Sequence, residues 1–153
     1  MPQLYGEYPC KLDAKGRLKM PSALLKKLGG DGPWTFFVNR GLENCLMIYP
    51  EEVWESTVEQ IKTLNPYRVE DRNFTRLFFR GAHDIVTDSA DRILINKGML
   101  QHAGIEKDAI LFAYLDRMEL WDRERYFDIL DADVHDYSRL AEKVLGGNQQ
   151  MGI

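Results

Sequence analysis

Leu12-Asp-Ala-Lys-Gly-Arg-Leu-Lys-Met-Pro21 decides the fold, because a related stretch, Thr87-Asp-Ser-Ala-Asp-Arg-Ile-Leu-Ile-Asn96, follows 75 residues later. At this offset six of the 35 residue pairs from Leu4 to Val38 are identical, where background residue frequencies would give roughly two. In both stretches an Asp precedes an Arg by four residues, on either side of a short polar turn. The chain of 153 residues is therefore predicted to be an internal duplication.

Each half is predicted to fold as β-turn-β-α-β-β with a closing helix, which makes the protein an α+β chain with two pseudo-symmetric halves. Strands are expected at 8–12, 17–21, 34–39 and 45–49, and again at 82–86, 92–96, 109–114 and 118–121. Helices are expected at 23–28, 51–64, 97–103 and 123–132. Ser22 and Asp122 are predicted N-caps, and Gly29 and Gly104 are predicted to end the two short helices.

The predicted organisation is a first half at 1–64, a linker and connecting helix at 65–79, a second half at 80–132 and a C-terminal segment at 133–153. The connecting helix is expected at 71–79, and the tail from residue 146 is expected to fray. The two halves are expected to share one barrel-like core rather than to fold independently.

The closing helices carry more large apolar residues than one small domain needs to cover: Val53, Trp54, Ile61, Tyr126, Phe127 and Leu130. We therefore expect the protein to be an oligomer. Because the two ends of a repeat are alike, copies can also pair head to tail, and such pairing closes into a ring when the rotation allows.

The repeated turns are the candidate site. An Asp at the first position of a turn can accept hydrogen bonds from backbone N–H groups two or three residues later, so Asp13 and Asp88 are predicted to shape their loops. Gly16 and Asp91 occupy the fourth position, where a positive φ is tolerated. Arg17 and Arg92 would then be held rigidly, which suits a phosphate or a guanine edge. The alternative is that each Asp–Arg pair only stabilises its own turn.

Charge is unevenly distributed along the chain, whose net charge is −4. Residues 1–48 carry seven basic and four acidic side chains, a net of +3, so residues 49–153 carry a net of −7. Lys11, Lys15 and Lys19 surround Arg17. They give residues 11–21 a net of +3, whereas residues 86–96 have a net of −1. The first copy is therefore expected to dominate contact with a polyanion.

Several classes of function lack supporting residues. No apolar run reaches the roughly 20 residues that span a bilayer, and the N-terminal stretch lacks the regions of a signal peptide. Cys10 and Cys45 form neither a metal spacing nor a disulfide framework. The histidines (His83, His102 and His135) share no metal-ligand spacing, and no nucleophile or phosphate-cradling motif is present. We expect a cytoplasmic protein that is not an enzyme and needs no metal or cofactor.

Four segments resemble the MraZ family: Tyr5-Gly-Glu-Tyr8, the stretch from Leu12 to Pro21, Arg76-Leu-Phe-Phe-Arg-Gly-Ala82 and Met118-Glu-Leu-Trp-Asp122. The resemblance extends from about Leu4 to Leu130 and includes both Asp-x-x-x-Arg copies. It implies two SpoVT/AbrB-like β-α-β halves and assembly into a ring. It also implies a nucleoid-associated repressor that binds short direct repeats in the promoter of its own division and cell-wall gene cluster.

On this resemblance Arg17 and Arg92 contact double-stranded DNA, with Lys11, Lys15 and Lys19 beside the first copy, while Asp13 and Asp88 shape the loops. The second copy departs from the family pattern at Asp91 and Asn96, where Gly and Pro are usual. The two loops are therefore not expected to contact DNA equally.

Two other functions stay open. One is a protein-binding module that sequesters a basic partner through the acidic side chains of the C-terminal half, and the resemblance suggests an RNA methyltransferase from the same gene cluster. These acids are Asp122, Glu124, Asp128, Asp131, Asp133 and Asp136. The other is a small barrel enzyme that uses clustered carboxylates.

Overall fold

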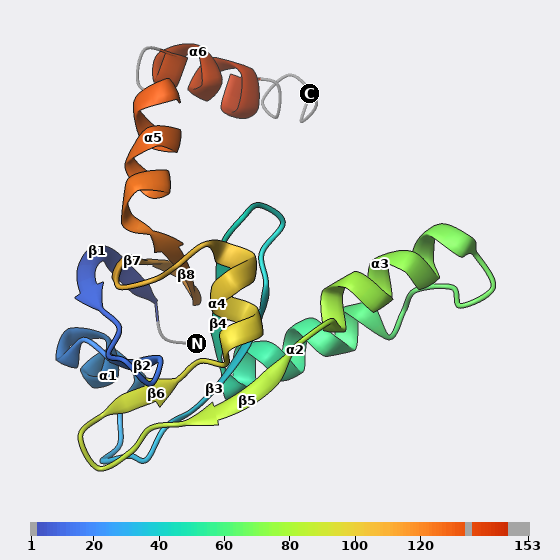
Figure 1. Ribbon diagram of the computed structural model, residues 1–153. Helices are drawn as coiled ribbons and strands as arrows, with labels where there is room; N and C mark the ends of the chain where they lie inside the picture. The colour runs from blue at the N-terminus through green and yellow to red at the C-terminus, as the bar shows by residue number, and fades with distance from the viewer. Residues whose placement is uncertain (1–2, 134–135, 147–153) are drawn as a thin grey trace. The chain divides into compact units, whose positions relative to one another are not determined.

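The computed structural model describes residues 3–133 and 136–146 (Figure 1). Residues up to Arg123 form one compact unit, and residues from Glu124 onward form a second. Of the tail that is predicted to fray, 146–153, all but Gly146 lies outside the described residues.

Six strands of the first unit form one antiparallel sheet, and two more form a separate ribbon. The ribbon pairs β2 (Arg17–Lys19) with β6 (Arg92–Leu94). The mixed α+β class with two repeated halves is confirmed. The sheet order is β1 (Leu4–Lys11), β7 (Asp108–Leu115), β8 (Arg117–Asp122), β4 (Leu46–Pro50), β3 (Thr35–Arg40) and β5 (His83–Val86).

The two halves exchange strands. β3 and β4 of the first half are flanked by β5 from the second half, and β7 and β8 of the second half are flanked by β1 from the first. The exchange is pseudo-symmetric, because Leu18 faces its repeat counterpart Ile93 in the ribbon and Met47 faces Glu119 between β4 and β8. Each half therefore supplies backbone hydrogen bonds that complete the sheet of the other.

The two strands around each turn do not pair with each other along most of their length. β1 and β2 are joined only by a bridge between Leu12 and Leu18. Beyond it, β1 runs along β7 and β2 runs along β6. The ribbon places Leu18 against Ile93, and both side chains are fully buried. Alternation of apolar residues predicts a strand and its buried face, but not which strand is its neighbour.

The halves share a hydrophobic core, but the sheet does not close into the expected barrel. One cluster of buried side chains includes Phe36 and Ile48 from the first half and Leu111 and Leu120 from the second. Among the described strands, none pairs with the outer edge of β1 or of β5. The outer edges of β1 and β5 therefore stay open in the described part of the chain.

The helices lie close to the predicted positions. The first unit contains α1 (Ser22–Leu28), α2 (Glu51–Ile61), α3 (Val69–Phe79) and α4 (Lys97–Ala103). Helix α5 (Arg123–Asp133) starts directly after Asp122. It is followed by α6 (Tyr137–Ala141) and a π-helical turn (Glu142–Gly146), in a segment where the sequence predicts no helix.

Two helix ends differ from expectation. Ser22 is the first residue of α1 rather than its N-cap, because Pro21 precedes the helix and no side chain caps it. Its counterpart α4 is capped by Asn96, whose side-chain oxygen accepts a hydrogen bond of 2.8 Å from Met99 N. Helix α2 ends at Ile61 rather than at residue 64. In the turn that follows, the backbone N–H groups of Thr63 and Leu64 donate to carbonyl groups three residues earlier, as in a 3₁₀ helix.

Helices α2 and α3 form an arm, residues 51–79, that projects from the sheet (Figure 1). Trp54 anchors it. The Trp54 ring stacks on Phe37 of β3 at 5.2 Å between centroids and on Phe78 of α3 at 5.5 Å. Trp54 and Val53 are buried within their own chain. The expectation that these two residues need a second copy to cover them is therefore wrong.

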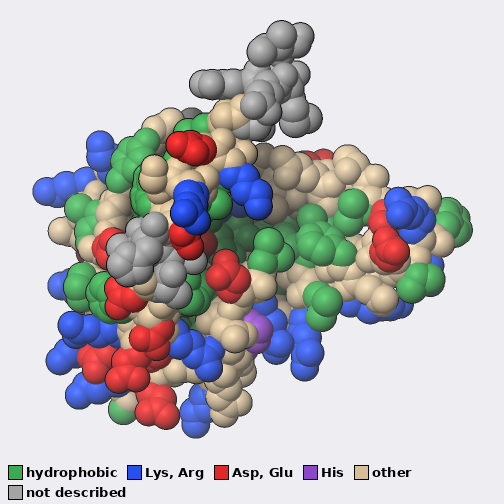
Figure 2. Space-filling view, turned by 90° about the horizontal axis from the view of Figure 1, so that it is seen from above, with side chains coloured by type: hydrophobic (Ala, Val, Ile, Leu, Met, Phe, Trp, Pro, Cys, Tyr) green, Lys and Arg blue, Asp and Glu red, His purple; other side chains and the backbone are tan. Residues whose placement is uncertain are grey.

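The uncovered apolar surface of the arm lies on α3 and the loop before it. No α3 residue is fully buried. Tyr67 is 90% exposed, Leu77 62%, Val69 60% and Phe74 41%. Figure 2 shows hydrophobic side chains gathered along the arm. A surface of this kind typically contacts another protein chain.

Leu18→Ala is expected to lower the free energy of unfolding by about 2–5 kcal/mol, because it leaves a cavity where the two halves meet. The matched control is Leu94→Ala on the facing strand. The Leu94 side chain is 54% exposed, so its loss should cost less than about 0.5 kcal/mol. Urea unfolding followed by circular dichroism measures both changes. Equal losses would contradict the assignment of the ribbon's buried face.

Candidate functional site

The first repeated turn is held by a set of short hydrogen bonds around Asp13. Its Oδ1 accepts hydrogen bonds from the backbone N of Lys15 at 3.0 Å and of Arg17 at 2.9 Å. Its Oδ2 accepts one from Arg17 Nε at 2.6 Å. Backbone bonds from Asp13 N to Arg17 O and from Gly16 N to Asp13 O close the turn. The Arg17 side chain is therefore fixed at its inner end.

The second turn repeats this arrangement atom for atom. Asp88 Oδ1 accepts hydrogen bonds from the backbone N of Ala90 and of Arg92, both at 2.9 Å. Its Oδ2 accepts a 2.9 Å bond from Arg92 Nε. The backbone bonds from Asp88 N to Arg92 O and from Asp91 N to Asp88 O recur as well. Each predicted Asp–Arg pair thus exists and stabilises its own turn.

These contacts favour the ionised carboxylates. The hydrogen bond from the backbone of Arg17 is the main cause that holds the pKa of Asp13 below its ordinary value, and the Arg17 guanidinium adds to it. The backbone of Arg92 lowers the pKa of Asp88 in the same way. Both carboxylates are therefore ionised at neutral pH and can orient the guanidinium groups permanently.

The fourth residue of each turn contacts the other half. Gly16 has φ +85° and Asp91 has φ +59°. Gly16 O accepts a hydrogen bond from Ile95 N at 3.0 Å, and Asp91 O accepts one from Met20 N at 2.9 Å. A Cβ on Gly16 would lie only 2.8 Å from Ile95 O, so the close approach of the two halves requires a glycine there.

The ribbon gathers the cations of both repeats on its outer face. Leu18 and Ile93 point into the core, so the residues beside them point outward. Arg17 faces Leu94 across the strands, and Lys19 faces Arg92. In the sequence Lys19 belongs to the first repeat alone. The pairing of β2 with β6, however, places it next to Arg92 of the second repeat.

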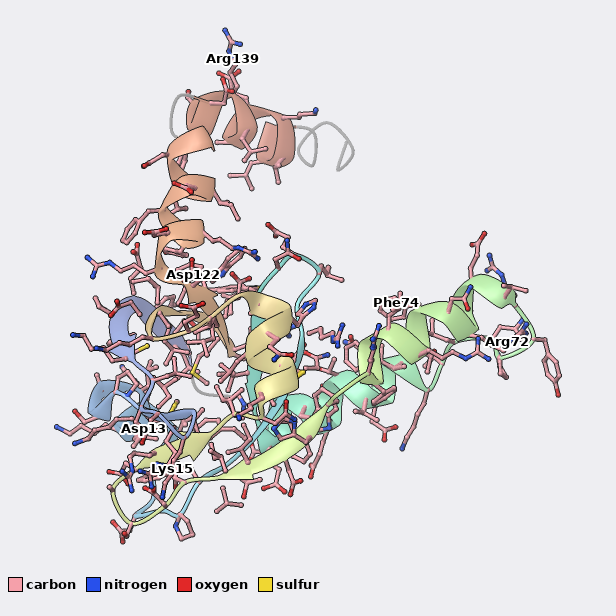
Figure 3. The ribbon with its side chains drawn as sticks, in the orientation of Figure 1. Asp13, Lys15, Arg72, Phe74, Asp122 and Arg139 are labelled. Atoms are coloured by element: carbon pink, nitrogen blue, oxygen red, sulfur yellow. The ribbon has the colours of Figure 1, made fainter. Side chains whose placement is uncertain are left out.

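The other two predicted cations lie apart from this face. Lys15 is exposed in the first turn, and Figure 3 shows it beside Asp13. Lys11 is exposed at the end of β1, paired in register with Asp108 of β7. Lys11 is therefore part of the six-stranded sheet and not of the ribbon.

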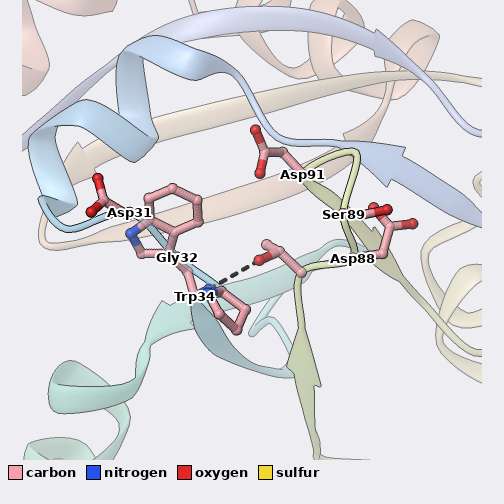
Figure 4. A pocket seen from close by; sticks show the side chains of 8 residues that line it. Asp31, Gly32, Trp34, Asp88, Ser89 and Asp91 are labelled. Carbon is pink, nitrogen blue, oxygen red and sulfur yellow. Dashed lines mark hydrogen bonds between the residues drawn. The ribbon is translucent and has the colours of Figure 1, made fainter.

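The surroundings of the two turns differ in charge. The hollow beside the second turn is lined by three acids, Asp31, Asp88 and Asp91, and by Trp34 (Figure 4). Trp34 N donates a hydrogen bond of 2.9 Å to Thr87 Oγ1, which ties this loop of the first half to the second turn. A hollow beside the first turn is lined by Asp13, Lys15, Lys97 and Glu106.

Sequence reasoning missed Asp31 and Lys97. Each comes from the half opposite to the turn that it borders, so no local motif marks it. The repeat alignment could have pointed to Asp31, because it pairs Asp31 with Glu106. Each of these two acids lines the hollow beside the turn of the other half.

Metal ligation, thiol chemistry and membrane spanning each depend on features of their own in the described residues. The described residues contain no group of three or more His, Cys, Asp or Glu side chains placed to hold a metal ion. Burial raises the pKa of Cys10 to about 11 and that of Cys45 to about 12, so both thiols stay protonated and poorly nucleophilic at neutral pH. No helix within the described ranges is long and apolar enough to cross a membrane.

Asp13 and Asp88 are expected to make stability depend on pH in acid. Their pKa values are lowered in the folded chain, so their contribution is fully present above the ordinary value of 3.8 and is lost as the pH falls through the lowered values. The variant Asp13→Asn/Asp88→Asn should therefore melt below the wild type at neutral pH. The difference should begin to narrow below about pH 4 and close as the pH falls through the lowered pKa values. Thermal unfolding across this range measures it, and a difference that does not change with pH would contradict the assignment.

The model of a family described as "MraZ protein, putative antitoxin-like" matches residues 4–77 and again residues 78–144. A protein of Christiangramia forsetii is 36% identical over 154 aligned residues, which cover 100% of this chain and 99% of the relative. Relatives from Heliobacterium modesticaldum and Lachnoclostridium phytofermentans are 37% and 42% identical, over 92% and 79% of this chain and 95% and 82% of their own lengths.

All three relatives bear the name "Transcriptional regulator MraZ". The two family-model matches fall on the two repeated halves, and the relatives align with most of the chain. The chain belongs to the MraZ family.

Proposed function

We propose that this protein is a transcriptional regulator that binds double-stranded DNA sequence-specifically through the β2–β6 ribbon. Its proposed target is a set of short direct repeats in the promoter of its own division and cell-wall gene cluster, where it acts as a repressor. The observation that carries the proposal is the outward face of the ribbon, on which Arg17, Lys19 and Arg92 stand together. The names of the relatives support the regulatory role.

The shape of the ribbon suits DNA. The major groove admits a two-stranded β-ribbon, and arginine there can bind the O6 and N7 atoms of guanine in a bidentate manner. Arg17 and Arg92 each use Nε to bind their own Asp. Within the described residues no hydrogen bond occupies their Nη1 and Nη2 atoms. The Asp–Arg pair and DNA contact are therefore compatible, since the carboxylate orients a guanidinium whose outer edge remains available.

The net charge of −4 does not oppose this role. Counterion release depends on the cations placed at the phosphates and not on the charge of the whole chain. Assembly of several copies would multiply the ribbon, and we propose a ring-like homo-oligomer for this reason. The exposed apolar side chains of α3 give such an assembly a surface to use.

We expect the protein to sediment at a multiple of 17.8 kDa at micromolar concentration. Leu77→Asp should shift it toward the monomer, because it places a charge on the apolar face of α3. Leu42→Asp is the matched control, since Leu42 is 97% exposed in the loop between β3 and β4. Sedimentation equilibrium measures all three proteins, and a wild type found only at the mass of one chain would contradict the oligomer.

Arg17→Ala is expected to weaken binding to DNA from upstream of its own gene more than Arg92→Ala does, because the second turn borders three acids. Removing one phosphate contact lowers the slope of log affinity against log salt by about 0.9. The loss recurs in each bound copy, so the slope should fall by more than one unit. Fluorescence anisotropy across a salt series measures this.

The melting temperatures of both arginine variants serve as the control. If the pairs only stabilise the turns, Arg17→Ala lowers the melting temperature and leaves the salt slope of the folded protein unchanged. That result would overturn the assignment of the site.

A protein-binding role is the second candidate. On α5 the acidic residues Asp128 and Asp131 alternate with Phe127, Ile129 and Leu130, which are 38–40% exposed. Such a helix fits a basic partner with an apolar groove, for which the proposed class is an RNA methyltransferase. If protein binding is the main role, the purified protein should not bind DNA. Neutralising the acidic side chains at 122–136 should then abolish capture of the partner.

A further inference from the structure

We infer that Lys97, from the second half, forms with Lys15 of the first turn a two-lysine clamp for one phosphate of the DNA backbone. The inference rests on the proposed DNA-binding function. It adds Lys97, which lies outside both Asp-x-x-x-Arg copies, and makes the first turn a site built by both halves.

The position of the two lysines supports the clamp. Two hollows adjoin the first turn, and both Lys15 and Lys97 line each of them. The two residues therefore stand on the ridge between the hollows, although 82 positions separate them in the chain. Both side chains are exposed, and within the described residues neither ammonium group forms a salt bridge.

The backbone on each side of the clamp is fixed. Lys15 N donates a hydrogen bond to Asp13 Oδ1, which holds the turn. Lys97 is the first residue of α4, whose start is capped by the Asn96 side chain. Two ammonium groups that extend from fixed backbone lose less freedom on binding a phosphate than two groups on mobile loops.

Three carboxylates lie near the two lysines. Asp13 lines one hollow, but its two oxygens are already used by its own turn. Glu106 and Asp84 line one hollow each, whereas the two lysines line both. His83 and Asn96 also line one hollow and hydrogen-bond loosely to each other at 3.3 Å.

The second turn lacks the clamp. The repeat counterparts of Lys15 and Lys97 are Ala90 and Ser22, both exposed and uncharged. The pseudo-symmetry of the halves therefore predicts a single clamp in each chain, at the first turn. Lysines placed at positions 22 and 90 should therefore create a second clamp at the second turn.

The test compares Lys97→Ala, Lys15→Ala and the double variant with the wild type, using a duplex from upstream of its own gene and an unrelated duplex of equal length. If both lysines hold one phosphate, the double variant should lower the salt slope by about 0.9 for each bound chain, and each single variant by no more than the double variant. Both duplexes should lose affinity by the same factor, because phosphate contacts carry no sequence information.

Controls separate this inference from the proposed function. Lys62→Ala removes a lysine from the arm, where it pairs with Glu59, and should leave the salt slope unchanged. Ser22→Lys/Ala90→Lys should steepen the slope. The clamp is overturned if Lys97→Ala leaves affinity and slope unchanged while Arg17→Ala weakens binding, or if the double variant lowers the slope by the amount of two phosphate contacts rather than one. If Arg17→Ala also has no effect, the proposed DNA-binding site itself is wrong.

Discussion

The antiparallel pairing of β2 with β6 is the constraint on which the rest of the molecule depends. It is only three residues long on each side, yet it brings the two turns together and buries Leu18 against Ile93. The flanking bonds from Ile95 N to Gly16 O and from Met20 N to Asp91 O extend it into the turns themselves. Without this ribbon the cations of the two repeats would belong to separate loops.

The Asp–Arg pairs show how one interaction can serve both structure and recognition. An exposed ion pair contributes little to stability by itself, because solvent screens it and two side chains must be ordered. Here the same carboxylate also accepts two backbone hydrogen bonds, so most of the ordering is achieved by the turn. The guanidinium is thereby oriented before any ligand arrives, and the entropy lost on binding is correspondingly smaller.

Local features of the fold could be predicted from the sequence, whereas strand partners could not. The duplication, the α4 boundaries and the strand positions follow from apolar periodicity and from turn residues such as Gly104. The exchange of β1 and β5 between the halves does not, because both strands have the same pattern whichever neighbour they pair with. The residue type of Ser22 predicts an N-cap, but Pro21 precedes the helix and no side chain caps it.

The candidate site divides in the same way. Asp13, Arg17 and their counterparts are visible in the sequence because they lie four residues apart in one turn. Asp31 and Lys97 are not, since each reaches its turn from the opposite half through the three-dimensional arrangement of the strands. The charge of a loop counted along the chain therefore differs from the charge that surrounds it in space.

The exchange of edge strands has a consequence for synthesis on the ribosome. Translation proceeds from the N-terminus, so β1, β2 and β3 emerge long before their partners β7, β6 and β5. The first half must wait with open strand edges until at least residue 94 has left the exit tunnel, and β1 until residue 115. Such edges favour pairing with other chains. Nascent copies of this protein on neighbouring ribosomes are therefore positioned to exchange strands with each other before either chain is complete.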